Sequence, residues 1–210
     1  MLHTFLFFFL LWLSLILSTL LFIVFPFFYL PVFRRFRKKY VGFWTRQWAR
    51  FAIFLSGSKI SVSGRENIPK TIPFAIISNH QGYMDIPVLM SIFPFPLSFI
   101  AKKELLKAPF INLWILALEC MIIDRKRPLV SYRKISEKIK RPNANPIIIF
   151  PEGTRSKGNI ELPRKKGGVK LIEDSGIKMV NVKIEGTYRV WEENRKITPS
   201  KIKVHIYLNK

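Results

Sequence analysis

The sequence is poor in several residue types, and each shortage argues against a class of protein. A single cysteine, Cys120, excludes an internal disulfide and fits a reducing compartment. No cluster of cysteine and histidine has the spacing of a zinc site, which argues against a structural metal. Acidic residues are scarce, because 13 aspartates and glutamates stand against 35 lysines and arginines, giving a formal net charge of +22. Such a chain attracts anions: nucleic acid, anionic lipid headgroups, phosphorylated metabolites or acidic proteins.

Residues 1–33 contain no aspartate, glutamate, lysine or arginine. Their apolar core, LFFFLLWLSLILSTLLFIVFPF, is as long as the roughly 20 apolar residues that cross a bilayer. A cleaved signal peptide is the alternative, but it would have a basic start, a shorter apolar run and a cleavage site between small residues. This segment shows none of the three, so we predict that residues 1–33 form a retained membrane anchor.

Residues 34–57 begin with a basic run and continue as an amphipathic segment. The run of five basic residues between Arg34 and Lys39 indicates the cytoplasmic side of a membrane and suits anionic headgroups. The aromatic residues that follow can share one helical face, which lies at the water–lipid boundary or, equally well, packs on the core of the protein. We predict an interfacial segment on the cytoplasmic side of the cell membrane. The face would contain Phe43, Trp44, Trp48, Phe51, Phe54 and Leu55.

Residues 58–210 alternate short β-rich runs with longer mixed segments. This alternation predicts an α/β catalytic domain with a mostly parallel central sheet of about seven strands flanked by helices. The membrane helix and the amphipathic helix would precede it. Segments 103–119, 128–141 and 167–176 are expected to be helical, as is a helix starting at Asp85. The predicted strands are 59–64, 73–78, 97–101, 121–124, 146–150, 179–184 and 203–208.

Polar residues follow four of the predicted strands. Because ligands of open parallel sheets bind outside the carboxyl ends of the strands, we expect these residues to face one cleft. Their convergence is stronger support for a site than any single motif. They are Asn79 and His80 after the second strand, Lys102 and Lys103 after the third, Asp124 and Arg125 after the fourth, and residues 151–155 after the fifth.

His80 and Asp85 are the candidate catalytic pair. An imidazole accepts a proton at Nε2 when a carboxylate holds its Nδ1–H, and a turn through Gln81 and Gly82 would bring the two side chains together. The alternative is that Asp85 only caps its helix and His80 is an ordinary loop residue. The strand-end position favours catalysis. No serine or cysteine stands where this base would activate it, so a substrate hydroxyl or water is the expected nucleophile.

The segment IIIFPEGTRSKG, residues 147–158, is the candidate phosphate site. Proline and glycine bracket Glu152 and predict a sharp loop, in which Arg155 offers a bidentate fork to phosphate near the Thr154 hydroxyl. A basic loop is usually only a solvated surface. A nucleic-acid site would interleave exposed aromatic residues that stack on bases, and this loop lacks them. The upstream anchor therefore favours a lipid phosphate and no nucleic acid.

The two motifs resemble those of the glycerolipid acyltransferases. NHQGYMD (79–85) matches the N-H-x-x-x-x-D signature, FPEGTRS (150–156) matches the second hallmark, and the sequence is similar to 1-acyl-glycerol-3-phosphate (lysophosphatidic acid) acyltransferases from residue 35 onward. The resemblance implies that His80 is the general base on a free glycerol hydroxyl and that Asp85 orients it. It also implies a thioester donor, acyl-CoA or acyl carrier protein, with no covalent acyl-enzyme and no cofactor or metal.

The resemblance further implies an acceptor site with Arg155 on the phosphate. The block CMIIDR (120–125) resembles the family's G-x-x-F-I-D-R, with Glu119 at the usual glycine and Ile122 at the usual phenylalanine. Asn181 replaces the proline of a later V-P-V-x-I block. These departures bear on the choice of acceptor and acyl chain. The implied substrate-binding residues are Glu152, Gly153, Thr154, Arg155, Arg125, Lys102 and Lys103.

The leading hypothesis is an enzyme of phospholipid biosynthesis that acylates lysophosphatidic acid to phosphatidic acid on the cytoplasmic side of the cell membrane. Its partners would be the lysophospholipid acceptor, acyl-CoA or acyl carrier protein, and an anionic membrane surface. Three alternatives are the same chemistry on another lipid acceptor, a hydrolase that delivers water, and a non-catalytic, membrane-tethered binder of anionic lipids. Of these, only the non-catalytic lipid binder requires no general base such as His80.

Overall fold

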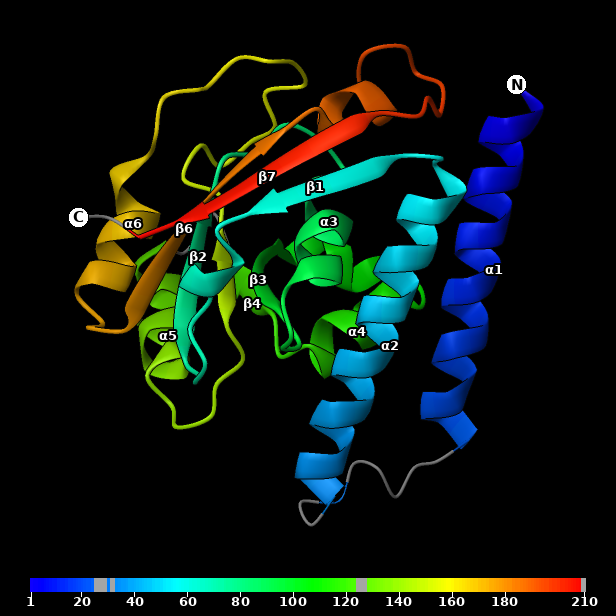
Figure 1. The fold of residues 1–210 in the computed structure, drawn as a ribbon. Helices are drawn as coiled ribbons and strands as arrows, with labels where there is room; N and C mark the ends of the chain where they lie inside the picture. Colours follow the sequence, from blue (N-terminus) through cyan, green and yellow to red (C-terminus); the bar gives the residue numbers. More distant parts are fainter. Residues whose placement is uncertain (25–29, 31–32, 124–127, 209–210) are drawn as a thin grey trace.

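In the computed structural model, which describes residues 1–24, 30, 33–123 and 128–208, one sheet carries helices on both of its faces (Figure 1). The strands lie in the order β1-β7-β6-β2-β5-β3-β4. Each strand predicted from the sequence matches an observed one to within two residues at its described ends. The strands are β1 (Lys59–Ser63), β2 (Phe74–Ser78), β3 (Ser98–Lys102), β4 (Met121–Ile123), β5 (Ile147–Ile149), β6 (Lys178–Glu185) and β7 (Lys201–Tyr207).

The direction of the strands sets where the site lies. Neighbouring strands are parallel throughout except for the antiparallel pair β6 and β7. Strands β6, β2, β5, β3 and β4 therefore share one direction, and their carboxyl ends lie at one edge of the sheet. The mostly parallel sheet predicted from the sequence is confirmed. The segments that follow these five strands are brought to the same side of the molecule.

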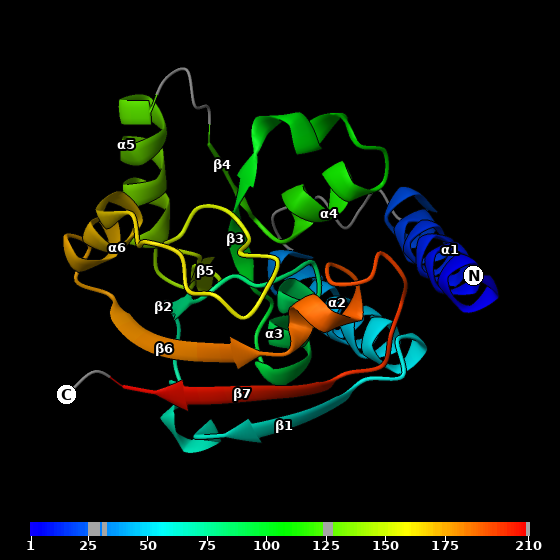
Figure 2. The ribbon, with the colours of Figure 1, turned by 90° about the horizontal axis from the view of Figure 1, so that it is seen from above.

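Both faces of the sheet are buried, because side chains alternate along each strand. On β2, Phe74 and Ile76 join a cluster with residues of α2 (Arg34–Leu55) and α3 (Asp85–Ile92). Ala75 and Ile77 point the other way, into a cluster with residues of α5 (Pro128–Ile139) and α6 (Lys166–Glu173). Figure 2 shows α5 and α6 on one side of the sheet and α2 and α3 on the other.

The single helix expected over residues 103–119 is wrong in detail. The segment divides into a 3₁₀ helix, η4 (Lys103–Lys107), and a short helix, α4 (Ile111–Ala117). Pro109 lacks a backbone N–H and Phe110 has φ +63°, so the chain changes direction between the two helices. The apolar content of the segment indicated a helix, but the proline and the left-handed residue prevent a continuous one.

Helix α1 (Leu2–Val24) is, within the described residues, the one helix long and apolar enough by length and composition to cross a membrane, with a mean hydropathy of 2.0 over Leu2–Leu20. It packs along α2 (Figure 1). Polar contacts join it to the rest of the protein: Trp114 Nε1 donates to Thr19 Oγ1 at 2.9 Å, the Ile197 N–H donates to Thr4 Oγ1 at 3.0 Å, and His3 Nε2 lies 2.9 Å from the Leu55 carbonyl oxygen. Much of its apolar surface stays exposed, so membrane insertion remains a prediction for this helix.

Helix α2 packs on the protein through its small residues. Val41, Ala49 and Ala52 are buried, whereas Phe43 and Phe54 keep 55% and 76% of their surface exposed. The remaining predicted aromatic positions are partly buried at the edges of this contact. One face of α2 therefore packs on the core and another presents aromatic side chains outward, and the position of that second face at a membrane surface stays a prediction.

Gly64→Ala should destabilise the fold strongly. Gly64 ends β1 with φ +77°, and a Cβ there would lie 1.9 Å from the Ile206 carbonyl oxygen, which is backbone and cannot rotate away. The left-handed conformation alone costs about 1–2 kcal/mol for a residue with a side chain, so we expect at least about 2 kcal/mol in total. In thermal unfolding, this corresponds to a Tm lower by about 4–8 °C.

Gly158→Ala is the matched control for that measurement. A Cβ at Gly158 would meet no described atom within 4 Å. Equal unfolding temperatures for the two alanine variants would contradict the placement of Gly64 against β7.

Candidate active site

The turn after β2 is attached to β6 by a side-chain amide. Asn79 Nδ2 donates to the Ile184 carbonyl oxygen at 2.8 Å, and the Ile184 N–H donates to Asn79 Oδ1 at 2.7 Å. The amide thus hydrogen-bonds like a backbone strand just beyond the last paired residues, Ser78 and Val182. This pair of bonds fixes the start of the turn that carries His80.

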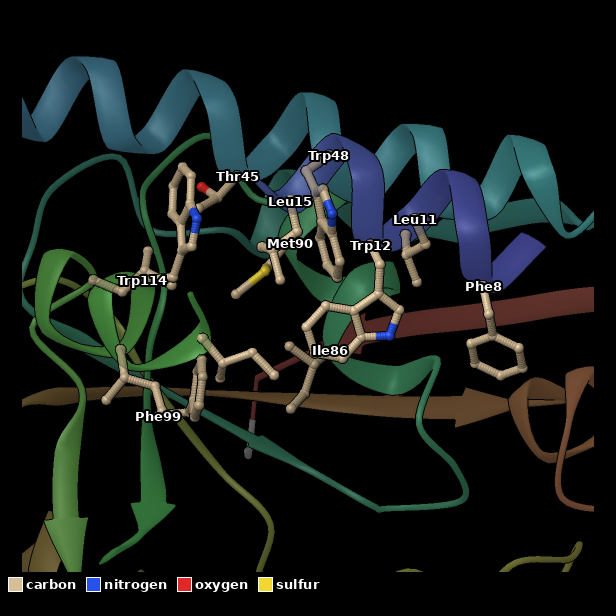
Figure 3. Close-up of a pocket in the computed structure, with 13 residues that line it drawn as sticks. Phe8, Leu11, Trp12, Leu15, Thr45, Trp48, Ile86, Met90, Phe99 and Trp114 are labelled. Carbon is tan, nitrogen blue, oxygen red and sulfur yellow. The ribbon is translucent and has the colours of Figure 1, made fainter. Parts of the chain in front are cut away.

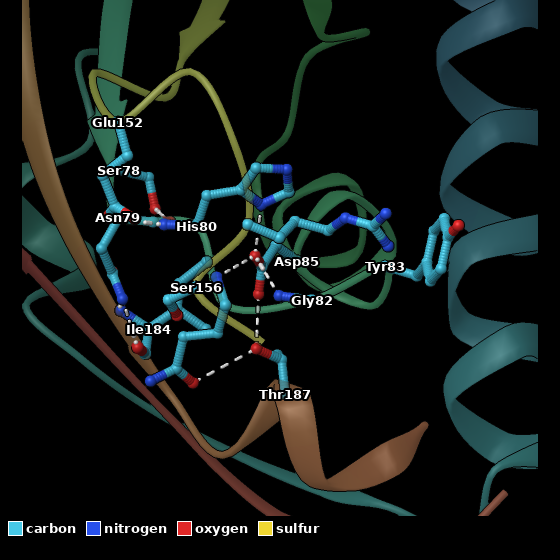
Figure 4. Close-up of polar contacts among 12 residues, drawn as sticks. Ser78, Asn79, His80, Gly82, Tyr83, Asp85, Glu152, Ser156, Ile184 and Thr187 are labelled. Atoms are coloured by element: carbon cyan, nitrogen blue, oxygen red, sulfur yellow. Dashed lines mark hydrogen bonds and ion pairs between the residues drawn. The ribbon is translucent and has the colours of Figure 1, made fainter. Parts of the chain in front are cut away.

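His80 and Asp85 lie in direct contact at this edge of the sheet (Figure 4). His80 Nδ1 and Asp85 Oδ2 are 2.6 Å apart, and the Asp85 side chain is fully buried while the His80 side chain keeps 17% of its surface exposed. A buried carboxylate on Nδ1 holds the neutral imidazole in the tautomer that leaves Nε2 free to accept a proton. The approach of the two side chains expected from the sequence is what the structure shows.

Four donors, among the described residues, converge on the Asp85 carboxylate (Figure 4). Oδ2 accepts the N–H of Gln81 at 2.7 Å and the N–H of Gly82 at 2.9 Å, in addition to the His80 ring. Oδ1 accepts the hydroxyl of Thr187. These hydrogen bonds fix the carboxylate, and the carboxylate in turn orients the imidazole.

The alternative in which Asp85 only caps its helix does not hold. The N-cap position of α3 belongs to Met84, and no side chain there bonds a helical N–H. Asp85 is the first helical residue, and its carboxylate turns back to the preceding loop. Its hydrogen bonds serve the turn with His80 and not the end of α3.

The second motif forms the wall behind His80. The N–H groups of Ser156 and Lys157 donate to the carbonyl oxygens of His80 and Gln81 at 2.8 and 3.0 Å. The Phe150 ring stacks on the His80 ring with 4.0 Å between centroids and 14° between planes. The two motifs, about 70 residues apart in the sequence, are therefore one hydrogen-bonded unit.

Glu152 and Gly153 make the sharp loop predicted after β5. Gly153 has φ +67°, a conformation that glycine adopts without strain, and its N–H donates to the Phe150 carbonyl at 3.0 Å. The Glu152 side chain is buried, and Oε1 accepts the backbone N–H of His80 at 3.2 Å. Burial raises the pKa of the Glu152 carboxyl. In this structure Glu152 supports the backbone of His80, and its expected contact with a substrate stays a prediction.

Arg155 lies at the same edge and is held on two sides. Its Nη1 donates to Glu192 Oε1 at 3.2 Å, and its guanidinium lies 3.6 Å from the centroid of the Tyr83 ring. The side chain keeps 25% of its surface exposed. Thr154, the neighbouring predicted residue, is exposed on the loop. A planar cation fixed and partly open to solvent suits a phosphate ligand.

The predicted cations on β3 and β4 are placed less fully. Lys102 is the last residue of β3 and does not follow the strand as expected, and its side chain lies outside what the structure describes. Lys103 begins η4 and is exposed. Asp124 and Arg125 lie outside the described residues. Strand direction places Lys102 and Lys103 at the edge that carries His80, and the contacts of all the predicted cations with a ligand stay predictions.

Glu119 occupies a backbone position that favours glycine. Its φ is +55°, in the left-handed region, which accounts for the glycine that is usual at this place in the resembling family. The glutamate here uses its side chain instead, since its carboxylate lies 3.4 Å from Lys38 Nζ. Glu119 thereby joins the segment before β4 to α2.

Two residues of the site, Thr187 and Glu192, were missed in the sequence. Both follow β6, whose carboxyl end lies at the same edge as those of β2 and β5. The strand-end rule that selected His80 and Arg155 would have selected them too, had it been applied to this strand. They were overlooked because no motif surrounds them.

An apolar cavity of about 280 Å³ lies beside the catalytic turn (Figure 3). Helices α1, α2, α3 and α4 and strand β3 line it, and Ile86, the residue after Asp85, forms part of its wall. Its apolar lining suits a hydrocarbon chain. The lining residues are Phe8, Leu11, Trp12, Leu15, Thr45, Trp48, Ile86, Met90, Phe99, Ile111, Trp114, Ile115 and Leu118.

Comparison with known proteins gives consistent similarities. A family model described as Acyltransferase matches residues 59–185. The 1-acyl-sn-glycerol-3-phosphate acyltransferase of Borreliella burgdorferi is 31% identical over 162 residues, covering 76% of this chain and 64% of that protein. Its counterpart from Pseudomonas aeruginosa is 34% identical over 156 residues, covering 70% and 58%. This chain spans about half to two thirds of the length of such curated relatives.

A solved structure shares the fold. The crystal structure of the 1-acyl-sn-glycerophosphate (LPA) acyltransferase PlsC from Thermotoga maritima matches with a TM-score of 0.77 and 32% sequence identity. The match covers 95% of this chain and 83% of that one. The similarity therefore includes the helices that precede the sheet as well as the sheet itself.

Proposed function

Because the chain belongs to the acyltransferase family, we propose that it transfers a fatty acyl group from a thioester to the free hydroxyl of lysophosphatidic acid, giving phosphatidic acid. The observation that carries the proposal is the contact of His80 with the buried Asp85 at the edge of the sheet that also holds Arg155. The names of the relatives supply the acceptor. Acyl-CoA and acyl carrier protein both fit as donors.

In the proposed reaction, His80 acts as a general base. Its Nε2 takes the proton of the acceptor hydroxyl as the oxygen attacks the thioester carbonyl, and the resulting imidazolium is stabilised by Asp85. The tetrahedral intermediate collapses, the carbon–sulfur bond breaks, and the thiolate takes the proton from the imidazolium. Cys120 is no candidate nucleophile, because it is buried and burial raises the pKa of its thiol to about 12.

The two ends of the lipid have separate sites in this proposal. Arg155 binds the phosphate, and Lys102, Lys103 and Arg125 are further candidates for it. The apolar cavity takes an acyl chain, and Ile86 in its wall adjoins Asp85. Helix α1 anchors the chain in the cell membrane, and the basic start of α2 lies at the cytoplasmic headgroups. The reacting hydroxyl then meets His80 at the membrane surface.

A panel of acceptors tests this function directly. Membranes carrying the protein are offered lysophosphatidic acid and several other lysolipids with one labelled acyl thioester, and the products are separated. We expect phosphatidic acid to be the main labelled product. A main product from another lysolipid would support the alternative acceptor, and labelled fatty acid alone would support the hydrolase.

Arg155→Ala should raise the KM for lysophosphatidic acid about 10- to 100-fold, because it removes charge-assisted hydrogen bonds to the phosphate. The value of kcat should change little. Arg155→Lys keeps the charge but loses the planar fork, so its KM should lie between the two.

Monoacylglycerol, which lacks the phosphate, is the matched acceptor for this comparison. Its acylation should be equally slow in wild type and Arg155→Ala. An unchanged KM for lysophosphatidic acid in Arg155→Ala would contradict this assignment and point to Arg125 or Lys102 as the phosphate ligand.

A further inference from the structure

Glu192 is a buried acid beside the phosphate-binding candidate. It lies in the connection from β6 to β7, just after the short 3₁₀ helix η5 (Thr187–Val190). Its side chain keeps only 2% of its surface exposed. Oε1 accepts the N–H of Tyr83 at 2.8 Å and Nη1 of Arg155 at 3.2 Å. Glu192 therefore joins the first motif to the second.

The second oxygen of this carboxylate, Oε2, is buried and has no hydrogen-bond partner among the residues that the structure describes, a property that it shares with Glu152 Oε2 in the same site. Burial raises the pKa of the Glu192 carboxyl. A buried carboxylate with one unsatisfied oxygen is unfavourable for stability, so its presence at the edge of a reactive site indicates a function.

The turn between His80 and Asp85 leaves space for the Glu192 side chain. A Cβ built on Gly82 would lie 2.5 Å from Glu192 Oε2. Glycine at this position of the first motif thus leaves the space that the carboxylate occupies. The same turn supplies the Gly82 N–H to Asp85, so the acid packs directly against the turn between His80 and Asp85.

Glu192 and Tyr83 together define where the arginine points. The Tyr83 ring lies against the guanidinium, with 3.6 Å between the Arg155 Cζ and the ring centroid, and Glu192 holds Nη1. A guanidinium has five N–H donors, and for Arg155 one of them has an acceptor among the residues that the structure describes. The others are available for a bidentate contact with phosphate.

We propose that Glu192 is a positioning residue, which holds Arg155 in the orientation that binds the phosphate of the acceptor. The inference rests on the proposed function, because it needs Arg155 to bind that phosphate. A side chain that is already ordered loses less conformational freedom when the ligand binds. Glu192 acts through Arg155 and does not touch the reacting atoms.

Glu192→Gln is the variant that tests this role, because it keeps the shape and the Oε1 acceptor but removes the charge. We expect KM for lysophosphatidic acid to rise about 3- to 10-fold, since a charge-assisted bond becomes a neutral one, while kcat stays within about 2-fold. A fall in KM would mean that Glu192 competes with the phosphate, and it would overturn the proposal.

Thermal unfolding separates a positioning role from a structural one. The raised pKa means that the ionised carboxylate destabilises the folded state once the pH rises through the folded-state pKa, and that this penalty is absent below the unfolded-state pKa. Glu192→Gln should therefore unfold at the same or a higher temperature than wild type at neutral pH, with the difference shrinking on acidification. A clearly lower Tm at neutral pH would indicate a structural role and overturn the proposal.

A double-mutant cycle with Arg155 tests whether Glu192 acts through the guanidinium. In the Arg155→Ala background, Glu192→Gln should cause no further rise in KM, because its effect passes through the missing guanidinium. Glu193→Gln, at the exposed neighbouring residue, is the control and should leave KM unchanged. Two results would overturn this inference alone: additive rises in KM in the double variant, or an unchanged KM in Glu192→Gln when Arg155→Ala raises KM. An unchanged KM in Arg155→Ala would overturn both the assignment of Arg155 to the phosphate and this inference.

Discussion

His80→Ala should lower kcat by about 10²–10⁴, the range that general-base catalysis supplies. The variant keeps Asp85 and the Arg155 loop. It removes only the proposed base that takes the proton of the lipid hydroxyl. Binding of the protein to anionic vesicles should stay near wild type, since the basic segment of α2 is unchanged. Release of thiol from an acyl thioester in the presence of lysophosphatidic acid measures the rate.

His205→Ala is the matched control for this experiment. His205 lies on β7, exposed, with its Nδ1 2.8 Å from Ser63 Oγ. Its loss should leave kcat unchanged. If purified His80→Ala released thiol as fast as wild type while lysophosphatidic acid was consumed, the base would have to be another group.

Asp85→Asn should have an effect of similar size for a different reason. Its two oxygens accept four hydrogen bonds from the described residues, three of them at Oδ2. An asparagine can keep its carbonyl oxygen at those three donors and turn its NH₂ group to the Thr187 hydroxyl, which can accept, but it removes the negative charge. The imidazolium formed in the reaction then lacks its counter-charge, and the same substitution in Ser-His-Asp hydrolases lowers kcat about 10⁴-fold. We expect a fall of about 10³–10⁴.

Stability should also fall in Asp85→Asn. Hydrogen bonds to a charged carboxylate become weaker bonds to a neutral amide, which costs about 1–3 kcal/mol in total and lowers Tm by several degrees. Asp174→Asn is the control, because Asp174 is exposed and accepts only the Tyr132 hydroxyl among the described contacts. An Asp85→Asn variant with the kcat of wild type would show that the carboxylate is not needed to orient His80.

The sheet was predictable from the sequence because its strands are buried on both faces. Runs such as residues 146–150 have few polar positions and end at proline or glycine, which limits them to short strands between turns. The strand-end rule then located His80 and the loop of Arg155 before any contact was known. The order of the strands along the chain and their parallel direction were sufficient to predict where His80 and Arg155 lie.

The contacts that complete the site were not predictable, since they join residues far apart in the sequence. Asn79 hydrogen-bonds the backbone of Ile184, Thr187 donates to Asp85, and Glu192 pairs with Arg155. Each depends on the packing of the β6–β7 connection against the first motif, and no local pattern of residues encodes that packing. The division of residues 103–119 at Phe110 was missed because its apolar content alone favours a helix.

The two motifs also depend on each other more than their sequences suggest. The carbonyl oxygens of His80 and Gln81 accept the N–H groups of Ser156 and Lys157, and Phe150 lies under the imidazole. A change in the loop after β5 therefore moves the base as well as the arginine. The proposed base and the proposed phosphate ligand therefore share one backbone framework.

The most direct measurement counts phosphatidic acid and free thiol together, in vesicles that contain the protein, an acyl thioester and lysophosphatidic acid. A base that deprotonates the lipid hydroxyl predicts equal amounts of the two products in wild type, no thiol release without the acceptor, and a joint fall of at least about 100-fold in His80→Ala. Thiol released at the wild-type rate in the absence of lysophosphatidic acid, or phosphatidic acid formed at full rate by His80→Ala, would contradict the account.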